Sequence, residues 1–281
     1  MIGDAVARTR PAGELPASGV RVLDLTRVIA GPVCTRYLAA LGAEVLRLDP
    51  PHHPDMQRGE MSDTLLGKRS ALLDLRSPEG IAALHRLLAH ADVVVCGYRP
   101  GALDRFGLTD DALATRHPGV VGVYLDAWGH SGPWQHRRGF DSVVQAPTGI
   151  ASIESSDGTR PGALPCQLLD HGTGYLAAAA VLDGLRRQSI HGGAHIRRLS
   201  LARTAAWLTQ SRSAAPRSAF AENGLPSRTA EEGHSPRWLT ELDRAGGRIT
   251  AVAPPGMLDD RPLQWPSKLH GYGNDPPTWS L

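Results

Sequence analysis

Apolar residues along the first two thirds of the chain alternate between two patterns. Short and nearly continuous apolar runs of strand length lie at 21–26, 44–49, 70–75, 92–97, 119–126 and 195–202. Stretches with apolar residues at every third or fourth position lie at 35–43, 77–91, 108–117 and from position 170 onward. Continuous runs are typical of strands buried on both faces, and the wider spacing is typical of helices. The alternation predicts βαβ units, in which the strands are parallel.

The stretch 77–91 carries the clearest helix signal. Ser77 is suited to the N-cap, Pro78 to the first turn and Glu79 to the positive end of the helix dipole. Its apolar stripe is expected to face the core.

These elements predict an α/β fold: an open, mostly parallel, Rossmann-like sheet with helices on both faces. Ligands of such sheets bind at the carboxyl ends of the strands. In this chain those ends lead into the loops at 26–32, 49–60, 97–106 and 125–141. The first turn reads TRVIAGP and lacks the GxGxxG fingerprint, which disfavours a dinucleotide-dependent dehydrogenase.

The composition and the periodicity of the sequence change after about position 205. The stretch 210–237 is rich in Ser, Ala, Arg and Pro without clear periodicity, which predicts a linker or a long loop. A small β element is expected within 237–258, followed by an extended Trp- and Pro-rich arm. The predicted organisation is a leader at 1–18, a Rossmann-like domain at 19–205, a linker at 206–236 and a short C-terminal segment at 237–281.

Composition changes this picture little. The 281 residues are 41% hydrophobic and 21% charged, with a net charge of +2, so no nucleic-acid partner is expected. The three cysteines, Cys34, Cys96 and Cys166, are far apart and form no metal-binding pattern, which favours a reducing, cytoplasmic compartment. No signal peptide and no apolar run of membrane-spanning length is evident, so no membrane partner is expected.

Asp170 lies where an apolar run enters a predicted helix, and Gly172 and Gly174 follow within about one turn. A carboxylate at this place is a common N-cap. It is also a suitable nucleophile, and backbone N–H groups near the two glycines would then stabilise an oxyanion. The spacing alone leaves both interpretations open.

Four segments in register resemble the class III CoA transferases, a family with formyl-CoA transferase, carnitine CoA transferase and the α-methylacyl-CoA racemases. They begin VLDLTRVIAGP, GKRSALLDLRS, GHSGPWQHRRGFD and LLDHGTGYL, and they span roughly residues 20–205 in unbroken order. The resemblance implies that Asp170 attacks an acyl-CoA thioester and forms covalent aspartyl intermediates. It implies acyl-CoA and a small carboxylic acid as substrates, and no permanently bound cofactor. It also implies a homodimer, or a heteromer with a longer homologue.

Seven positions match the family's CoA contacts: Val28, Leu73, Arg76, Arg105, Phe106, Arg138 and Asp141. The resemblance assigns the first five to the nucleotide and the CoA arm, and the last two to the region of the pantetheine. Guanidinium groups suit phosphates, because charge and geometry match. From the residues alone, Arg76 and Arg105 are also consistent with solvated surface residues, and residues such as Val28 and Phe106 more often belong to a core.

Two departures from the family pattern leave alternatives open. The racemases have a histidine where this chain has Phe140, and phenylalanine cannot exchange a proton, which disfavours a 2-methylacyl-CoA racemase. Only a short segment follows position 205, where family members have a second domain with a glycine-rich lid. A non-catalytic or partner-dependent CoA-binding homologue is therefore the main alternative to a self-sufficient transferase.

Overall fold

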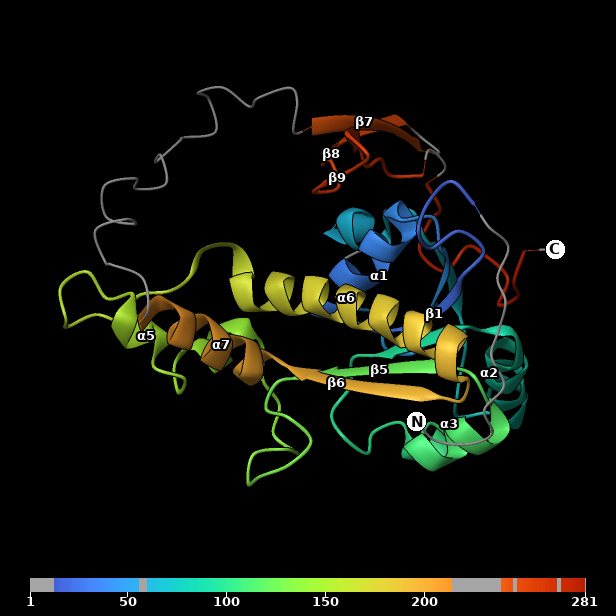
Figure 1. The fold of residues 1–281 in the computed structure, drawn as a ribbon, viewed down its shortest axis with the longest axis horizontal. Coiled ribbons are helices and arrows are strands. Elements are labelled where there is room, and N and C mark those ends of the chain that lie inside the picture. Colours follow the sequence, from blue (N-terminus) through green and yellow to red (C-terminus); the bar gives the residue numbers. More distant parts are fainter. Residues whose placement is uncertain (1–12, 56–59, 214–238, 245–246, 267–268, 281) are drawn as a thin grey trace.

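The computed structural model describes residues 13–55, 60–213, 239–244, 247–266 and 269–280 (Figure 1). Its centre is a six-stranded parallel sheet with the strand order β3-β2-β1-β4-β5-β6. The strands are β1 (Arg21–Leu25), β2 (Glu44–Asp49), β3 (Arg69–Leu72), β4 (Val93–Cys96), β5 (Val121–Asp126) and β6 (His195–Ser200). This is the strand order of doubly wound nucleotide-binding folds, and it confirms the predicted fold class.

Helices cover both faces of the sheet, as the continuous apolar strands require. On one face, α1 and α6 share a buried core with alternate strand residues such as Val22, Val95 and Val123. On the other face, α2 and α3 pack against Leu23, Leu46 and neighbouring side chains. The helices of these two layers are α1 (Ala30–Ala40), α2 (Pro78–His90), α3 (Asp110–Arg116) and α6 (Leu168–His191).

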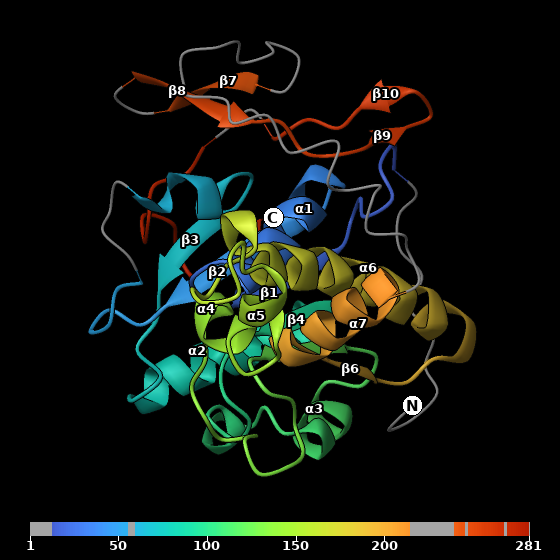
Figure 2. The ribbon, with the colours of Figure 1, turned by 90° about the vertical axis from the view of Figure 1, so that its left-hand side faces the viewer.

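Short helices and one longer helix complete the main domain. They are η1 (Glu60–Leu65), η2 (Asp104–Phe106), α4 (Asp141–Gln145), α5 (Ile150–Ile153), η3 (Pro165–Gln167) and α7 (Leu201–Ser213). In Figure 2, α4, α5 and α7 lie close to one another in front of the sheet. They gather at the end of the molecule where α6 begins (Figure 1).

Several predicted bounds differ from the structure. The first helix begins at Ala30 rather than near position 35, because glycine and proline are tolerated in a first helical turn. The third strand ends at Leu72 instead of position 75, so the residues after it form a loop that leads to α2. The last helix, α7, continues to Ser213, so the first residues of the expected linker are helical. Residues 214–236 of that linker lie outside the described residues.

The N-cap prediction for α2 is confirmed, since the N–H of Gly80 donates to Ser77 Oγ at 3.0 Å.

The C-terminal segment forms two antiparallel pairs, β7 (Leu239–Arg244) with β8 (Gly247–Val252) and β9 (Met257–Leu258) with β10 (Arg261–Pro262). A small apolar cluster that includes Trp265 and Leu66 joins this segment to the main domain. The tail then runs along the edge strand β3. There the N–H of Asp275 donates to the Ser70 carbonyl at 2.8 Å. This tail covers an edge that would otherwise expose unpaired backbone groups.

Candidate functional site

Two features lie at the carboxyl ends of the parallel strands. One is Asp170, near the start of α6; the other is a cavity between the loops that follow β1 to β4. Because α6 leads through a short turn into the amino end of β6, it runs antiparallel to the strands and begins at their carboxyl edge (Figure 1). The strand order reverses between β1 and β4, and ligands of doubly wound sheets bind at the carboxyl edge beside this point.

Asp170 is the third residue of α6, and Gln167 occupies the N-cap position. The interpretation of Asp170 as an N-cap is therefore wrong. The backbone that leads into the helix is strained, because Cys166 and Gln167 are non-glycine residues with φ of 58° and 46°. Strain of this kind persists only where the surrounding structure holds it, and it is enriched at functional sites.

Asp141 and Gln145, both on α4, hold the start of α6. Asp141 Oδ2 accepts the N–H groups of Leu169 at 2.8 Å and Asp170 at 3.2 Å. Gln145 donates from Nε2 to Asp141 Oδ1, and its Oε1 accepts the N–H of Leu164 at 2.8 Å. Asp141 is thus the group that satisfies the first N–H groups of the helix, a capping role supplied from another element.

The side chain of Asp170, unlike its backbone, has no hydrogen-bond partner among the described residues. The residue is buried, and its carboxylate accepts no hydrogen bond from any residue that the structure describes. Burial, reinforced by the negative charge of Asp141, raises the pKa of Asp170 to about 7. A desolvated carboxylate with a raised pKa is more basic and more nucleophilic than an ordinary aspartate.

The two glycines after Asp170 do not have the expected role. Both lie inside α6, where their N–H groups bond to carbonyls one turn earlier and are not free to reach an oxyanion. Gly174 serves packing instead: a Cβ atom there would lie 2.6 Å from the carbonyl oxygen of Ala30 on α1. Gly172 has no such constraint, since the nearest atom to its Cβ position is 3.6 Å away.

The cavity at the carboxyl edge has a volume of about 270 Å³ and walls of mixed character. One side is apolar, with Leu25, Leu48, Leu75 and neighbouring residues. The predicted CoA contacts that line it are Leu73, Arg76, Arg105 and Phe106. Sequence reasoning had assigned these four residues from the resemblance, and the fold brings them together from two loops.

The two predicted arginines differ in their surroundings. Arg76 is exposed and makes a bidentate ion pair with Asp74, with Nη2 to Oδ2 at 2.7 Å and Nε to Oδ1 at 2.9 Å. Arg105 has no carboxylate partner among the described residues, and its guanidinium lies 4.6 Å from the centre of the Phe106 ring. An unpaired arginine beside an aromatic ring is the better candidate for a phosphate or a nucleotide.

The other three predicted contacts lie outside this cavity. Asp141 is buried beside the start of α6, as described above. Val28 is in the turn between β1 and α1, directly after Arg27, which does line the cavity. Arg138 is in the exposed loop before α4, where its carbonyl accepts the indole N–H of Trp128 at 3.2 Å.

Sequence reasoning missed several residues of this region. Gln145, which braces both Asp141 and Leu164, had no sequence signal. Tyr98 lines the cavity from a loop that was expected to bind ligands, but it was not singled out. The charged Asp24 and Arg47 did carry a signal, because each lies between apolar residues in the interior of a strand, RVLDL and EVLRLD. Such charges are buried only when they are paired.

A second and larger cavity, of about 360 Å³, lies beside the first and shares Tyr98 and Leu103 with it. Its lining mixes acidic and basic groups, and Arg198 is paired there with Asp110. We regard the smaller cavity as the better anion site because three arginines and one carboxylate line it, whereas two arginines and three carboxylates line the larger one.

The described part of the chain has neither a metal-binding cluster nor a membrane-spanning helix. No group of three or more His, Cys, Asp or Glu side chains there has the geometry of a metal site. No helix within the same residues combines the length and apolar character that crossing a bilayer requires.

Comparison with known proteins places these features in a family context. The model of CoA-transferase family III matches residues 17–240. The probable fatty acyl-CoA transferase of Mycobacterium tuberculosis is 33% identical over 193 residues, which are 64% of this chain and 49% of that protein. The formyl-CoA:oxalate CoA-transferase of Rhodopseudomonas palustris is 32% identical over 186 residues, which are 62% of this chain and 43% of that protein. The chain thus spans about half the length of the curated relatives it matches.

Solved structures agree with the sequence matches. A crystal structure of the Mycobacterium tuberculosis protein aligns with a TM-score of 0.66 at 32% identity, over 73% of this chain and 59% of that one.

Proposed function

The chain belongs to CoA-transferase family III, and we propose that it moves CoA from an acyl-CoA donor to a carboxylic acid acceptor, with Asp170 as the nucleophile. One observation carries the proposal. A desolvated carboxylate without hydrogen-bond partners among the described residues lies at the same sheet edge as a cavity with an unpaired arginine.

The proposed reaction proceeds through covalent intermediates on Asp170. A carboxylate oxygen attacks the thioester carbonyl carbon of the donor, the C–S bond breaks, and CoA leaves as its thiolate. The mixed anhydride is then attacked at the aspartyl carbonyl by that thiolate, which releases the donor acid and leaves an aspartyl-CoA thioester. The acceptor carboxylate attacks this thioester, and the thiolate finally attacks the acceptor's acyl carbon in the new anhydride. This restores Asp170 and yields the new acyl-CoA.

The surroundings of Asp170 suit this role. The nucleophile must be ionised, and a pKa of about 7 leaves a large ionised fraction at neutral pH while it increases basicity. The hydrogen bonds that Asp141 accepts, with Gln145 bracing it, fix the backbone of the first turn of α6. They therefore limit the positions that the Asp170 carboxylate can take.

We place the nucleotide end of CoA in the smaller cavity. Arg105 would contact phosphate, and the apolar wall formed by Leu73, Leu75 and Phe106 would contact the adenine. The pantetheine arm would then follow the carboxyl edge of the sheet toward Asp170.

Racemisation is a poorer fit to the same site. Phe140 directly precedes Asp141 and is 60% exposed. Its side chain has no proton to exchange. A two-base mechanism at this position would need an ionisable group in its place.

A second candidate is a CoA-binding subunit that needs a partner. The chain spans about half the length of its curated relatives. One relative, 34% identical over 190 residues, is the beta subunit of the succinyl-CoA–L-malate CoA-transferase of Chloroflexus aurantiacus. Size-exclusion chromatography coupled to light scattering, with the chain alone and with a longer family member, would distinguish a self-associating chain from one that pairs with a different subunit.

Activity tests the proposal itself. The chain would be incubated with a panel of acyl-CoA donors and carboxylic acids, and the product acyl-CoA would be measured by liquid chromatography. We expect turnover with at least one pair and none from Asp170→Asn. CoA binding without turnover by the wild type would favour the subunit that needs a partner, and equal turnover by Asp170→Asn would refute the assigned nucleophile.

A further inference from the structure

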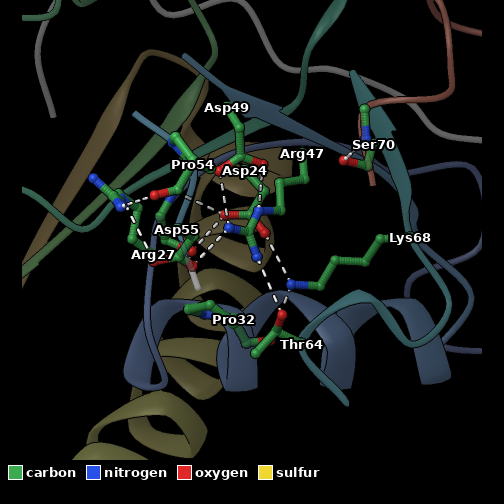
Figure 3. Close-up of polar contacts among 12 residues, drawn as sticks. Asp24, Arg27, Pro32, Arg47, Asp49, Pro54, Asp55, Thr64, Lys68 and Ser70 are labelled. Atoms are coloured by element: carbon green, nitrogen blue, oxygen red, sulfur yellow. Dashed lines mark hydrogen bonds and ion pairs between the residues drawn. The ribbon is translucent and has the colours of Figure 1, made fainter. Parts of the chain in front are cut away.

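A network of charged side chains lies beneath the turn between β1 and α1 (Figure 3). Three cations face three carboxylates, and all but one of the six side chains are almost fully buried. The network consists of Asp24, Arg27, Arg47, Asp49, Asp55 and Lys68. Burial of this many charges is costly unless each is paired, so the arrangement is held in one geometry.

Asp55 is the member that reaches the turn itself. Its side chain is 1% exposed, and Oδ2 accepts both the backbone N–H of Val28 at 3.0 Å and Arg47 Nη2 at 2.8 Å. Its Oδ1 accepts Arg27 Nε at 3.3 Å. In Figure 3 the carboxylate of Asp55 lies between the two arginines. One side chain therefore fixes two consecutive residues of the turn.

The backbone that Asp55 holds is strained. Val28 has a φ of 64°, a left-handed conformation that is very unfavourable for a β-branched residue. A glycine would adopt it freely, and glycine-rich turns are the usual solution after the first strand of such sheets. In this chain the conformation is retained with valine, so an external contact has to stabilise it.

The same network borders the smaller cavity. Arg27 and Asp49 both line it, and Arg47 binds Asp49 with Nε to Oδ2 at 2.7 Å while it also binds Asp55. Arg27 in turn donates to the carbonyl of Pro54 at 3.0 Å, which ties the loop after β2 to the turn after β1. The shape of the cavity wall thus depends on the contacts that Asp55 makes.

We propose that Asp55 is a positioning residue for CoA, which holds the strained turn at Val28 so that the cavity is formed before the ligand arrives. The inference rests on the proposed function, because it takes CoA to be the ligand of this cavity. Without Asp55 the turn would relax to other conformations, and only a fraction of molecules would be competent to bind. The apparent affinity falls by that fraction.

A double-mutant cycle tests the mechanism. The dissociation constant for CoA would be measured by isothermal titration calorimetry for the wild type, Asp55→Ala, Val28→Gly and the double variant. We expect Asp55→Ala to weaken binding about tenfold, since an unsupported left-handed valine is strongly disfavoured. In the Val28→Gly background the same substitution should weaken binding by less than about threefold, because glycine needs no support.

A matched control separates positioning from general destabilisation. Asp92 is also a buried aspartate, and its Oδ2 accepts a backbone N–H, that of Arg21, at 3.0 Å. It lies at the amino end of β4, away from the cavity. Asp92→Ala should lower the melting temperature and leave CoA affinity unchanged. If Asp55→Ala does not fold, Asp55→Leu replaces it in the cycle, since leucine has a similar size and cannot accept the N–H of Val28.

The outcomes distinguish this inference from the proposed function. An equal loss of affinity in both backgrounds would mean that Asp55 acts through charge rather than through Val28, and it would overturn the inference. The inference would also be overturned if Asp55→Ala bound CoA as tightly as the wild type while Arg105→Ala bound it more weakly. That result would leave the proposed function intact. Failure of the wild type to bind CoA would overturn both.

Discussion

Replacement of Asp170 by asparagine should stabilise the folded protein, and the gain should depend on pH because the raised pKa of Asp170 sets it. The carboxylate accepts no hydrogen bond within the described residues. Its burial and the negative charge of Asp141 together raise its pKa to about 7. Asparagine has nearly the same shape and no charge. The variant therefore removes the cost of ionising this position while it leaves the packing of α6 intact.

The magnitude follows from linkage between proton binding and folding. The ordinary pKa of 3.8 applies to the unfolded chain, and the value of about 7 applies to the folded one. Stability from this group is fully present below the unfolded pKa and is lost as the pH rises through the folded pKa. At about 1.4 kcal/mol per pKa unit the loss is at most about 4 kcal/mol. The positive end of α6 favours the ionised form, so we expect about 2–4 kcal/mol.

Urea unfolding at several pH values measures this difference directly. Tryptophan fluorescence would follow the unfolding of wild type and Asp170→Asn between pH 4 and pH 8.5. We expect the two free energies of unfolding to agree near pH 4, to diverge up to about pH 7 and to run parallel above it. Asp183 is a matched control on the same helix, because hydrogen bonds from Arg197 and Arg186 lower its pKa to about 2. Asp183→Asn should not stabilise the protein at any of these pH values.

A difference between wild type and Asp170→Asn that does not change with pH would refute this reasoning. So would a variant that is less stable than the wild type at pH 8. Either result would mean that the carboxylate is solvated or paired in the folded protein, and the argument for an activated nucleophile would fail with it.

Three further predictions concern neighbouring residues. Asp141→Asn removes the like charge beside Asp170, so the acidic limb of the kcat/KM profile should move to lower pH, and an unmoved limb would refute the coupling. Gly174→Ala should lower the free energy of unfolding by about 2 kcal/mol in urea titrations, because its Cβ would clash with a carbonyl of α1, whereas Gly172→Ala should be tolerated. Arg105→Ala should raise the dissociation constant for CoA about tenfold by calorimetry, and an unchanged constant would remove Arg105 from the site.

The sequence predicted the layers of the fold well, because buried parallel strands and amphipathic helices have distinct periodicities. It predicted bounds less well where proline or glycine permit more than one continuation. Ala30 shows this, since the helix begins there although the Gly-Pro pair suggested a later start. The strand order was not predicted, because pairing between strands far apart in the sequence leaves no local signal.

The site could be predicted only in part. Position and resemblance selected Asp170 and the four cavity residues as candidates, and the structure brings the latter four together. The residues that hold the start of α6 could not be found, since Asp141 and Gln145 lie more than twenty residues before Asp170 and only the fold brings them to this helix. The strained turn at Val28 was equally hidden, because a valine gives no indication of a left-handed backbone.

Localisation of a covalent intermediate tests the central claim most directly. The protein would be mixed with an acyl-CoA donor that it turns over, treated with hydroxylamine, digested and analysed by tandem mass spectrometry. Hydroxylamine attacks anhydrides and thioesters and leaves a hydroxamate on the acylated carboxyl group. We predict a hydroxamate on Asp170 that requires both donor and hydroxylamine. Turnover without modification of Asp170, or a hydroxamate on another carboxylate such as Asp141, would contradict the assignment.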